Sequence, residues 1–165
     1  MKRTPAPVIP LPLDRPRKSH GGHPDQPSRL SPLGPIRALV VDAAAAARRR
    51  VCRAGRRVAG DECLWFEAAD ADTASRTLAS SGIDLIVADS HSIRHSLQGW
   101  TDGATARPGQ PAPLIVVISD GEPQRIQQML DAGAECCLPK HLPEHILEIE
   151  LRRLVVQTRR KARRS

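Results

Sequence analysis

The sequence predicts an α/β protein with a doubly wound parallel sheet. Short apolar runs alternate with helix-forming segments, and the links between them are mostly short. The runs are rich in Ile, Leu and Val at consecutive rather than alternate positions, which is typical of strands buried on both faces of a parallel sheet. Because aromatic residues make up only 2% of the chain, its core must be built from Ala, Val, Leu and Ile. Repeated strand–helix units of this kind place helices on both faces of the sheet.

The first half of the predicted domain holds three strands and two helices. The first strand covers 36–41, and the helix after it, 44–59, is rich in Ala and Arg, which favour helices. Its apolar residues recur at steps of four, three and four, as on one helix face. Gly60 ends this helix. The remaining elements of this half are a strand at 63–66, a helix at 72–80 and a strand at 83–88.

The second half begins with the least regular part of the sequence. Residues 90–112 are rich in Gly, Pro and Ser and predict a loop, with at most a short helix around 93–100. A strand follows at 114–118. Pro123 suits the first turn of a helix, which Gly133 closes. We expect the buried face of that helix to consist of Ile126, Met129 and Leu130, and the last strand to cover 136–138.

The last helix, opened by Pro143, is apolar on more than one face. Its apolar residues are Ile146, Leu147, Ile149, Leu151, Leu154, Val155 and Val156. One face of a sheet does not need so wide an apolar surface, so the excess predicts either a second partner surface or additional core contacts.

The chain divides into a domain and two basic ends. Residues 1–35 hold nine of the fifteen prolines and form an expected disordered, Pro-rich, basic leader, in which His20 and His23 are not expected to bind metal. The predicted domain covers 36–157, and 158–165 is a basic C-terminal tail. Six basic and two acidic residues give the leader +4, residues 36–151 carry −4, and 152–165 carry +7, which agrees with the net charge of +7. Basic ends of this kind predict weak, sequence-blind nucleic-acid binding at most.

Composition excludes several other classes. No apolar run approaches the length of a membrane helix, and the prolines near the N-terminus interrupt any secretory signal. The four cysteines, Cys52, Cys63, Cys136 and Cys137, lack zinc-type spacing, and a disulfide framework is not expected. We therefore expect a cytoplasmic protein with reduced thiols.

Polar residues follow four of the predicted strands. Asp42, Asp89, Ser119 and Lys140 each stand at or just after the carboxyl end of a strand. In open parallel sheets, ligands and chemistry gather beyond that edge. Two acids, a hydroxyl and an amine are therefore expected to converge there.

The motifs resemble those of response-regulator receiver domains, the phosphorylated modules of two-component signalling. The resemblance rests on five segments in order: 40–42, 68–74, 84–89, 113–119 and 133–140. It covers nearly all of 36–157. It implies a flavodoxin-like (βα)5 fold with strand order 2-1-3-4-5, and it implies a signalling module rather than an enzyme.

The resemblance also implies a role for each strand-end residue. Asp89 is the expected phosphoacceptor, Lys140 the cation that contacts the phosphoryl group, and Ser119 the switch hydroxyl. The expected Mg²⁺ ligands are the carboxylates of Asp42 and Asp89 and the main-chain carbonyl of His91. From the residues alone, Asp42 and Lys140 could instead form a structural ion pair, Asp89 could be a turn residue, and Ser119 could cap the following helix.

Several positions depart from the family pattern. Ala43 replaces the second member of the acidic pair, so Mg²⁺ is expected to bind more weakly. Asp120 replaces a small neutral residue, and its charge either opposes a phosphate or partly replaces the missing acid. Cys137 stands where an aromatic side chain usually changes rotamer, and His141 where a proline usually follows the lysine.

Two functions follow as hypotheses. The first is a phosphorelay receiver that takes a phosphoryl group from a histidine kinase or phosphotransfer protein. It would signal to a downstream protein, or form a homodimer, through a face that includes the last helix. The second is a pseudo-receiver, a protein-interaction module that works without phosphorylation, and Ala43 is the residue that favours it.

Overall fold

A computed structural model describes residues 34–93, 97–101 and 111–164 of the chain. Five strands and the helices between them alternate along it. In order, the elements are β1 (Ile36–Val41), α1 (Ala45–Ala59), a 3-10 turn η1 (Gly60–Glu62), β2 (Cys63–Ala68), α2 (Ala71–Ser80), β3 (Leu85–Asp89), α3 (Leu97–Thr101), β4 (Leu114–Ser119), α4 (Pro123–Asp131), β5 (Cys136–Pro139) and α5 (Glu144–Ala162).

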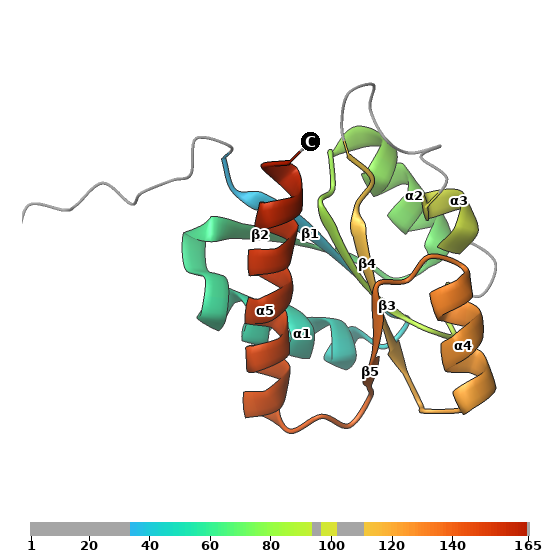
Figure 1. The fold of residues 1–165 in the computed structure, drawn as a ribbon. Helices are drawn as coiled ribbons and strands as arrows, with labels where there is room; N and C mark the ends of the chain where they lie inside the picture. Colours follow the sequence, from blue (N-terminus) through green and yellow to red (C-terminus); the bar gives the residue numbers. More distant parts are fainter. Residues whose placement is uncertain (1–33, 94–96, 102–110, 165) are drawn as a thin grey trace, which may run out of the picture.

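The strands form one parallel sheet in the order β2-β1-β3-β4-β5, which confirms the predicted fold and strand order. Helices α1 and α5 cover one face, and α2, α3 and α4 cover the other (Figure 1). All carboxyl ends of the strands therefore point to one edge of the sheet, which is where the candidate residues of the sequence fall.

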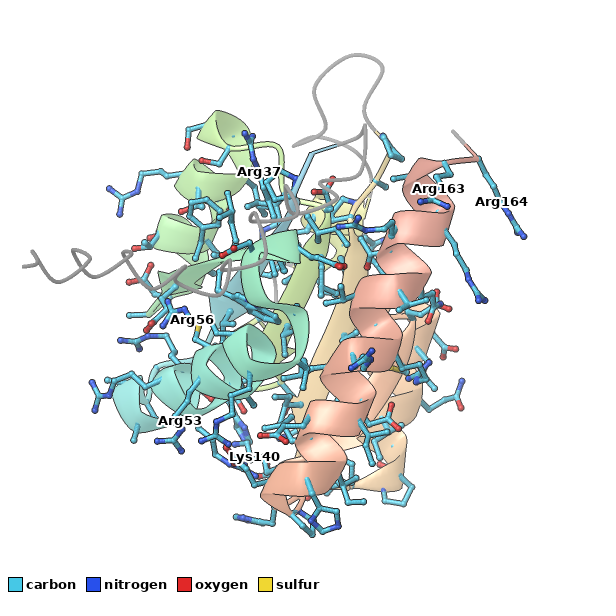
Figure 2. The ribbon with its side chains drawn as sticks, turned by 90° about the vertical axis from the view of Figure 1, so that its left-hand side faces the viewer. Arg37, Arg53, Arg56, Lys140, Arg163 and Arg164 are labelled. Carbon is cyan, nitrogen blue, oxygen red and sulfur yellow. The ribbon has the colours of Figure 1, made fainter. Side chains whose placement is uncertain are left out.

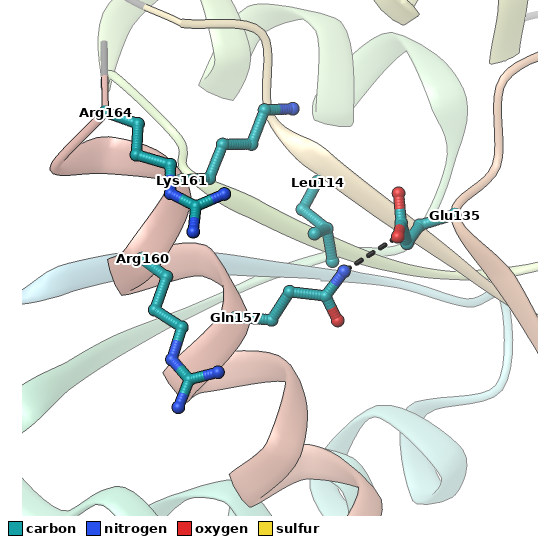
Figure 3. A pocket seen from close by; sticks show the side chains of 6 residues that line it. All are labelled: Leu114, Glu135, Gln157, Arg160, Lys161 and Arg164. Carbon is teal, nitrogen blue, oxygen red and sulfur yellow. Dashed lines mark hydrogen bonds between the residues drawn. The ribbon is translucent and has the colours of Figure 1, made fainter.

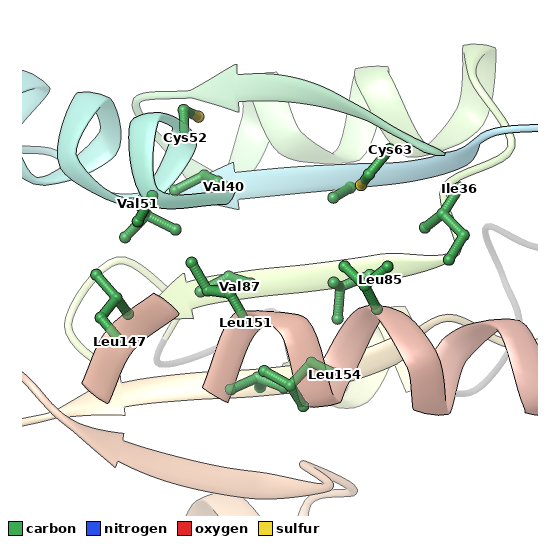
Figure 4. Packing of buried hydrophobic residues seen from close by; sticks show 14 of the residues in the cluster. Ile36, Val40, Val51, Cys52, Cys63, Leu85, Val87, Leu147, Leu151 and Leu154 are labelled. Carbon is green, nitrogen blue, oxygen red and sulfur yellow. The ribbon is translucent and has the colours of Figure 1, made fainter. Parts of the chain in front are cut away.

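Two apolar clusters lie on opposite faces of the sheet. Under α1 and α5, side chains such as Val40, Leu85 and Leu151 pack together (Figure 4). Under α2, α3 and α4, the core contains Leu39, Ile86 and other side chains that alternate with the first set along the same strands. Every residue of β3 is buried. This central strand ends on Asp89.

Most predicted elements are confirmed, with shifts of a few residues at their ends. β2 runs two residues beyond its predicted end, and β3 begins at Leu85 rather than at residue 83. The expected buried face of α4 is confirmed only for Met129, because Leu130 is 37% exposed and Ile126 is half-buried. Helix α4 is short, with nine residues, and contributes to the core on that face chiefly through Met129.

The last helix differs most from its predicted extent. α5 continues to Ala162, so residues 158–162 of the predicted tail are helical and the boundary at 157 falls inside the helix. Ile149 and Val156 of its apolar set are 59% and 45% exposed. Part of the apolar excess is therefore not used in the core.

Two local features show how the sequence sets these elements. The side chain of Asp70 accepts a hydrogen bond from the amide of Thr73 at 2.7 Å and so caps the start of α2. In α1, Gly55 lies directly against the indole ring of Trp65 on β2, and a Cβ there would overlap the ring. The glycine therefore sets the close approach of α1 to β2.

The cysteines are partly or fully buried thiols. All four cysteines are free. Burial raises the pKa of the Cys52 and Cys63 thiols to about 12 and also raises those of Cys136 and Cys137. No helix in the described ranges is long and apolar enough to cross a membrane. The predicted leader, apart from its last two residues, lies outside the described residues.

Candidate functional site

Four strand ends meet at one edge of the sheet. Strands β1 and β3 are paired as far as Val41 and Ala88, the residues directly before Asp42 and Asp89. The pairing of β3 with β4 extends to Asp89 and the residue before Ser119. Ser119 in turn pairs with the last residue of β5, directly before Lys140. Parallel register alone therefore brings these four residues to neighbouring positions.

Asp89 is a buried carboxylate whose side chain is only 6% exposed. Its Oδ2 atom accepts hydrogen bonds from the amides of His91 and Ser92, at 3.1 and 3.2 Å, and from the Ser92 hydroxyl at 3.4 Å. Its Oδ1 atom lies 2.8 Å from Nζ of Lys140. A buried charge needs a partner of opposite sign and hydrogen bonds, and this carboxylate has both.

Lys140 is shared between two carboxylates. Besides Asp89, its ammonium lies 3.1 Å from Oδ1 of Asp120, whose side chain is 50% exposed. The hydrogen bond to Asp89, and then that to Asp120, raises the pKa of Lys140. The hydrogen bond from Lys140 is also the main reason why the pKa of Asp120 is lowered. Lys140 and Asp120 are therefore both charged at neutral pH.

His91 connects this ion pair to α4. Its Nε2 atom lies 2.9 Å from Nη1 of Arg125, and because a guanidinium can only donate, Nε2 is the acceptor. Its Nδ1 atom lies 3.5 Å from Nζ of Lys140. The rim of the site thus contains two acids and two bases, with the imidazole between them.

Arg50 of α1 holds the loop that follows Lys140. Its guanidinium donates to the main-chain oxygens of Lys140, at 3.4 Å, and of Leu142, and it forms an ion pair with Glu144 at 3.2 Å. These contacts fix the start of α5 against α1. They also restrain the backbone that carries the ammonium group.

The turn after β1 is held against the turn after β3. Oδ1 of Asp42 accepts a hydrogen bond from the amide of Ala44 at 2.7 Å. The amide of Ala43 donates to Oγ of Ser92 at 3.2 Å. Arg48 donates to the carbonyl oxygen of Asp42 at 2.6 Å and to that of Ala43 at 3.2 Å. Ser92 therefore connects the two turns that carry the carboxylates.

Ser119 supplies a buried hydroxyl without a partner. The residue is 2% exposed, and its Oγ atom has no hydrogen bond in the described part of the chain. Its carbonyl oxygen accepts the amide of Lys140 at 3.1 Å. Since a buried hydroxyl without a hydrogen bond is unfavourable, this group is available to a nearby acceptor.

Solved structures with the same arrangement of elements are numerous. A response regulator from Thermotoga maritima has a TM-score of 0.61 and 20% identity, over 74% of this chain and 98% of that chain. The chemotaxis response regulator CheY4 of Vibrio cholerae has a TM-score of 0.58 and 21% identity, over 73% and 98%. The receiver domain of a Saccharomyces cerevisiae response regulator, solved with its histidine phosphotransfer protein, has a TM-score of 0.62 and 17% identity, over 74% and 90%.

The chain has the fold of a response-regulator receiver domain. In sequence, no family model matches it, and the search of curated proteins finds no similar sequence. The likeness therefore rests on the receiver fold and on the residues at its strand ends.

The edge of this receiver fold has few oxygen donors to offer a metal ion such as Mg²⁺. Among the described residues, no group of three or more His, Cys, Asp and Glu side chains is arranged to hold a metal ion. Asp42 and Asp89 offer two carboxylates from adjacent strand ends, and the main-chain carbonyl of His91 is the third protein donor available. Mg²⁺ prefers such hard oxygen ligands and keeps several waters. Ala43 adds no carboxylate.

Three residues of this site were not found by sequence reasoning. Ser92, Arg50 and Arg125 hold the turns and contact the charged groups, but none belongs to a motif used above. Asp120 was recognised as a departure from the family pattern, and the structure pairs its carboxylate with Lys140. An ion pair between Asp42 and Lys140, the structural possibility raised above, does not occur in the described part of the chain; Lys140 pairs with Asp89 instead.

Proposed function

We propose that this chain is a receiver module that accepts a phosphoryl group on Asp89. The observation that carries the proposal is the 2.8 Å contact between Asp89 and Lys140, two residues brought together from the ends of β3 and β5. A carboxylate nucleophile beside a fixed cation is the arrangement that phosphoryl transfer requires, because the group in transfer carries dispersed negative charge.

Each residue has a proposed role in that transfer. An oxygen of Asp89 attacks phosphorus as the bond from phosphorus to the donor's histidine nitrogen breaks. Lys140 contacts a phosphoryl oxygen, and Ser119 donates its unpartnered hydroxyl to another. The hydrogen bonds to Oδ2 of Asp89 orient its carboxylate. Lys140 can contact both the Asp89 carboxylate and the phosphoryl group only if its ion pair with Asp120 breaks.

Asp42, Asp89 and the carbonyl of His91 are the proposed ligands of Mg²⁺. When bound, the ion would neutralise part of the phosphoryl charge. Weak binding is expected, since the amide of Ala44 already occupies one oxygen of Asp42 and Ala43 supplies none.

The proposed donor is a histidine kinase or a histidine phosphotransfer protein. The co-crystal of the yeast receiver domain with its phosphotransfer protein supports that class of partner for this fold. The proposed output is altered binding at the face made by α4, β5 and α5, either to a downstream protein or to a second copy of the chain.

The test is labelling with a small acyl phosphate. Wild-type protein is incubated with acetyl phosphate and Mg²⁺, and the added mass is measured by intact mass spectrometry. Asp89→Asn is the control, because it keeps the volume of the side chain and removes the nucleophile. The proposal expects labelling of wild type and none of Asp89→Asn; equal labelling of both would contradict it.

A pseudo-receiver is the second candidate, and two observations favour it. Ala43 removes a metal ligand, and Asp120 already lies 3.1 Å from the ammonium that a phosphate needs. Ala43→Asp separates the two functions. If wild type is not labelled but Ala43→Asp is, the scaffold is competent and the natural sequence works without phosphorylation. Labelling of wild type would exclude this second candidate.

A further inference from the structure

A pocket lies at the edge of the sheet where the strands begin, opposite the edge that carries Asp89. It has a volume of about 410 Å³, and its lining residues are Leu114, Glu135, Gln157, Arg160, Lys161 and Arg164 (Figure 3). They come from the start of β4, the turn before β5 and the last turns of α5. The pocket, here called the amino-edge pocket, is therefore a hollow between three parts of the fold. Its volume falls in the range of about 300–1,000 Å³ that is usual for small-molecule sites.

Hydrogen bonds within the fold hold the walls of the amino-edge pocket. Leu114, the first residue of β4, is 3% exposed and supplies an apolar floor. The amide of Glu135 donates to the carbonyl oxygen of Ile115 at 2.7 Å, and the carboxylate of Glu135 accepts a hydrogen bond from the side chain of Gln157 at 2.7 Å. These contacts connect β4, the turn before β5 and α5, so the hollow is already formed in the folded chain.

The α5 side of the pocket carries an excess of positive charge. Arg160 and Arg164 have no acidic partner in the part of the chain that the structure describes. The acid in the lining, Glu135, already accepts the hydrogen bond from Gln157. With Lys161, the lining contains three cations and one acid, and its net charge is +2. A concave surface with such an excess concentrates anions.

The stability of α5 does not account for this cluster of cations. Arg160 and Arg164 lie one turn apart, and like charges at that spacing destabilise a helix. Cations at the C-terminal end of a helix are favourable, but Arg159 and Arg163 already supply them at this end of α5. An anion bound between Arg160 and Arg164 would relieve their repulsion.

We propose that the amino-edge pocket binds a small molecule that carries a diphosphate group, such as a nucleoside diphosphate. A guanidinium group donates two parallel hydrogen bonds to one phosphate, so Arg160 and Arg164, on adjacent turns, would each hold one of the two linked phosphates. Lys161 would add a compact positive charge. The uncharged part of the ligand would lie over Leu114.

Other anions fit the pocket less well. Orthophosphate has one phosphate and would satisfy only one of the two arginines. Single-stranded nucleic acid is usually held by aromatic stacking, and no aromatic side chain lines the pocket.

The proposed ligand site is separate from the proposed phosphorylation site. The end of α5 that carries Arg164 lies at the opposite end of the molecule from Lys140 (Figure 2). The pocket is present while Asp89 is paired with Lys140. The inference therefore does not rest on the proposed receiver function, and Asp89→Asn should bind the diphosphate as wild type does.

The test is calorimetric titration of the full chain with inorganic pyrophosphate and with ADP, both without Mg²⁺. Each should bind at one site, at least about tenfold more tightly than orthophosphate or citrate, because two guanidinium groups match two linked phosphates. Adenosine, which lacks phosphate, should not bind. Added NaCl should weaken the binding of pyrophosphate, since exposed charges are screened by salt.

Matched variants separate the pocket from the general charge of the protein. Arg160→Gln with Arg164→Gln should weaken pyrophosphate binding by about tenfold or more. Arg49→Gln with Arg56→Gln, which removes the same charge from α1, should change it by less than about twofold. Circular dichroism checks that each variant is folded.

Amide chemical shifts locate the site without any substitution. When ¹⁵N-labelled protein is titrated with pyrophosphate, the amides of Glu135, Gln157 and Arg160 should shift most. The largest shifts at His91 and Lys140 would instead place the anion at the rim of the proposed phosphorylation site.

Several results would overturn the proposal. These are equal affinity for pyrophosphate and for orthophosphate or citrate, equal losses in the two double variants, the largest amide shifts at the strand ends near Lys140, and binding of single-stranded DNA through the same arginines more tightly than pyrophosphate. If pyrophosphate does not bind while acetyl phosphate labels Asp89, the pocket is not a diphosphate site and the proposed receiver function stands.

Discussion

Asp120 determines how much of the charge of Lys140 is available to a phosphate. The structure pairs its carboxylate with the ammonium of Lys140 at 3.1 Å. Of the two roles considered from the sequence, opposition to a phosphate is therefore favoured over replacement of the missing metal ligand. The side chain is half exposed, so it can move away at little cost.

Asp120→Asn is accordingly expected to speed labelling of Asp89. The substitution removes a negative charge beside the incoming phosphoryl group, and Lys140 then pairs with Asp89 alone. The labelling rate is therefore expected to rise by about three- to tenfold. The initial rate of mass increase with acetyl phosphate measures this. Glu122→Gln, which neutralises an acid two residues away, serves as the control and should leave the rate unchanged. Slower labelling of Asp120→Asn would show that its carboxylate assists the site instead.

Asp70 gives the stability of α2 a dependence on pH. The amide of Thr73 donates a hydrogen bond to its carboxylate and lowers its pKa below the ordinary 3.8. A carboxyl group with a lower pKa in the folded state stabilises the fold above its ordinary pKa, and this contribution is lost as the pH falls through the lowered value. Stability should therefore decline at acid pH partly through this residue.

Comparison of wild type with Asp70→Ala measures that contribution. The variant should unfold at a lower urea concentration at pH 7, and the difference should shrink as the pH falls below 3.8, the ordinary pKa of the Asp70 carboxyl group. Asp72→Ala, in the first turn of the same helix but without the capping bond, should cost less. A difference that stays constant from neutral to acid pH would exclude the ionised cap as its cause.

At the scale of elements, the contact between α1 and β2 depends on the absence of a side chain. Gly55 is buried in the middle of α1, where glycine is intrinsically unfavourable. The indole ring of Trp65 occupies the place that a Cβ would take. Helix propensity and packing therefore make opposite demands at this position.

Gly55→Ala is expected to destabilise the protein in spite of its better helix propensity. Overpacking costs about 1–3 kcal/mol and propensity returns at most about 1 kcal/mol, so a net loss of about 1–2 kcal/mol is expected. Urea unfolding measures it. Gly99→Ala in α3 is the control, because no atom lies within 4 Å of a Cβ there, and it should be neutral or stabilising. A stabilised Gly55→Ala would mean that the ring moves freely.

The elements themselves were largely predictable from the sequence, and the reasons are physical. Apolar runs such as that of β3 are typical of strands buried on both faces, and Pro123 marks the start of α4. Leu130 was placed wrongly because periodicity tells which residues share a helix face but not how much of that face a neighbour covers. The end of α5 was less predictable, because a run of arginines fits a helix and a solvated tail equally well.

At the scale of the whole molecule, residues beyond 157 take part in the fold. Thr158 is 3% exposed, and its hydroxyl donates to the carbonyl oxygen of Leu154 at 2.8 Å. Arg159 donates to the carbonyl oxygen of Glu62 at 3.2 Å and so ties α5 to the turn before β2. The last turns of α5 are thus attached to the turn between α1 and β2.

A chain ended after Gln157 is therefore expected to be less stable than the full chain. The loss should be about 1–3 kcal/mol, since a buried side chain and a tertiary contact disappear together. Urea unfolding of both chains measures it. Full-length protein with Arg160→Ala and Arg164→Ala isolates the effect of lost charge and should retain nearly full stability. Equal stability of the shortened chain would show that residues 158–165 are dispensable for the fold.

The candidate site was predictable in outline but not in its contacts. Residues that follow parallel strands must share an edge, so the convergence of Asp42, Asp89, Ser119 and Lys140 could be inferred from the pattern. The partners of those residues could not. Arg50 and Ser92 act through loops and distant elements, and hydrogen bonds of that kind leave no periodic trace in the sequence.

The shortness of β5 has a consequence for solubility. β5 is an outer strand of four residues, and its last residue, Pro139, has no amide hydrogen to donate. A strand of another molecule that approached this edge of the sheet would find too few backbone N–H donors to form a stable ladder of hydrogen bonds. Polymerisation by strand addition along this side of the sheet is therefore disfavoured, and concentrated solutions should resist amyloid-like growth from β5.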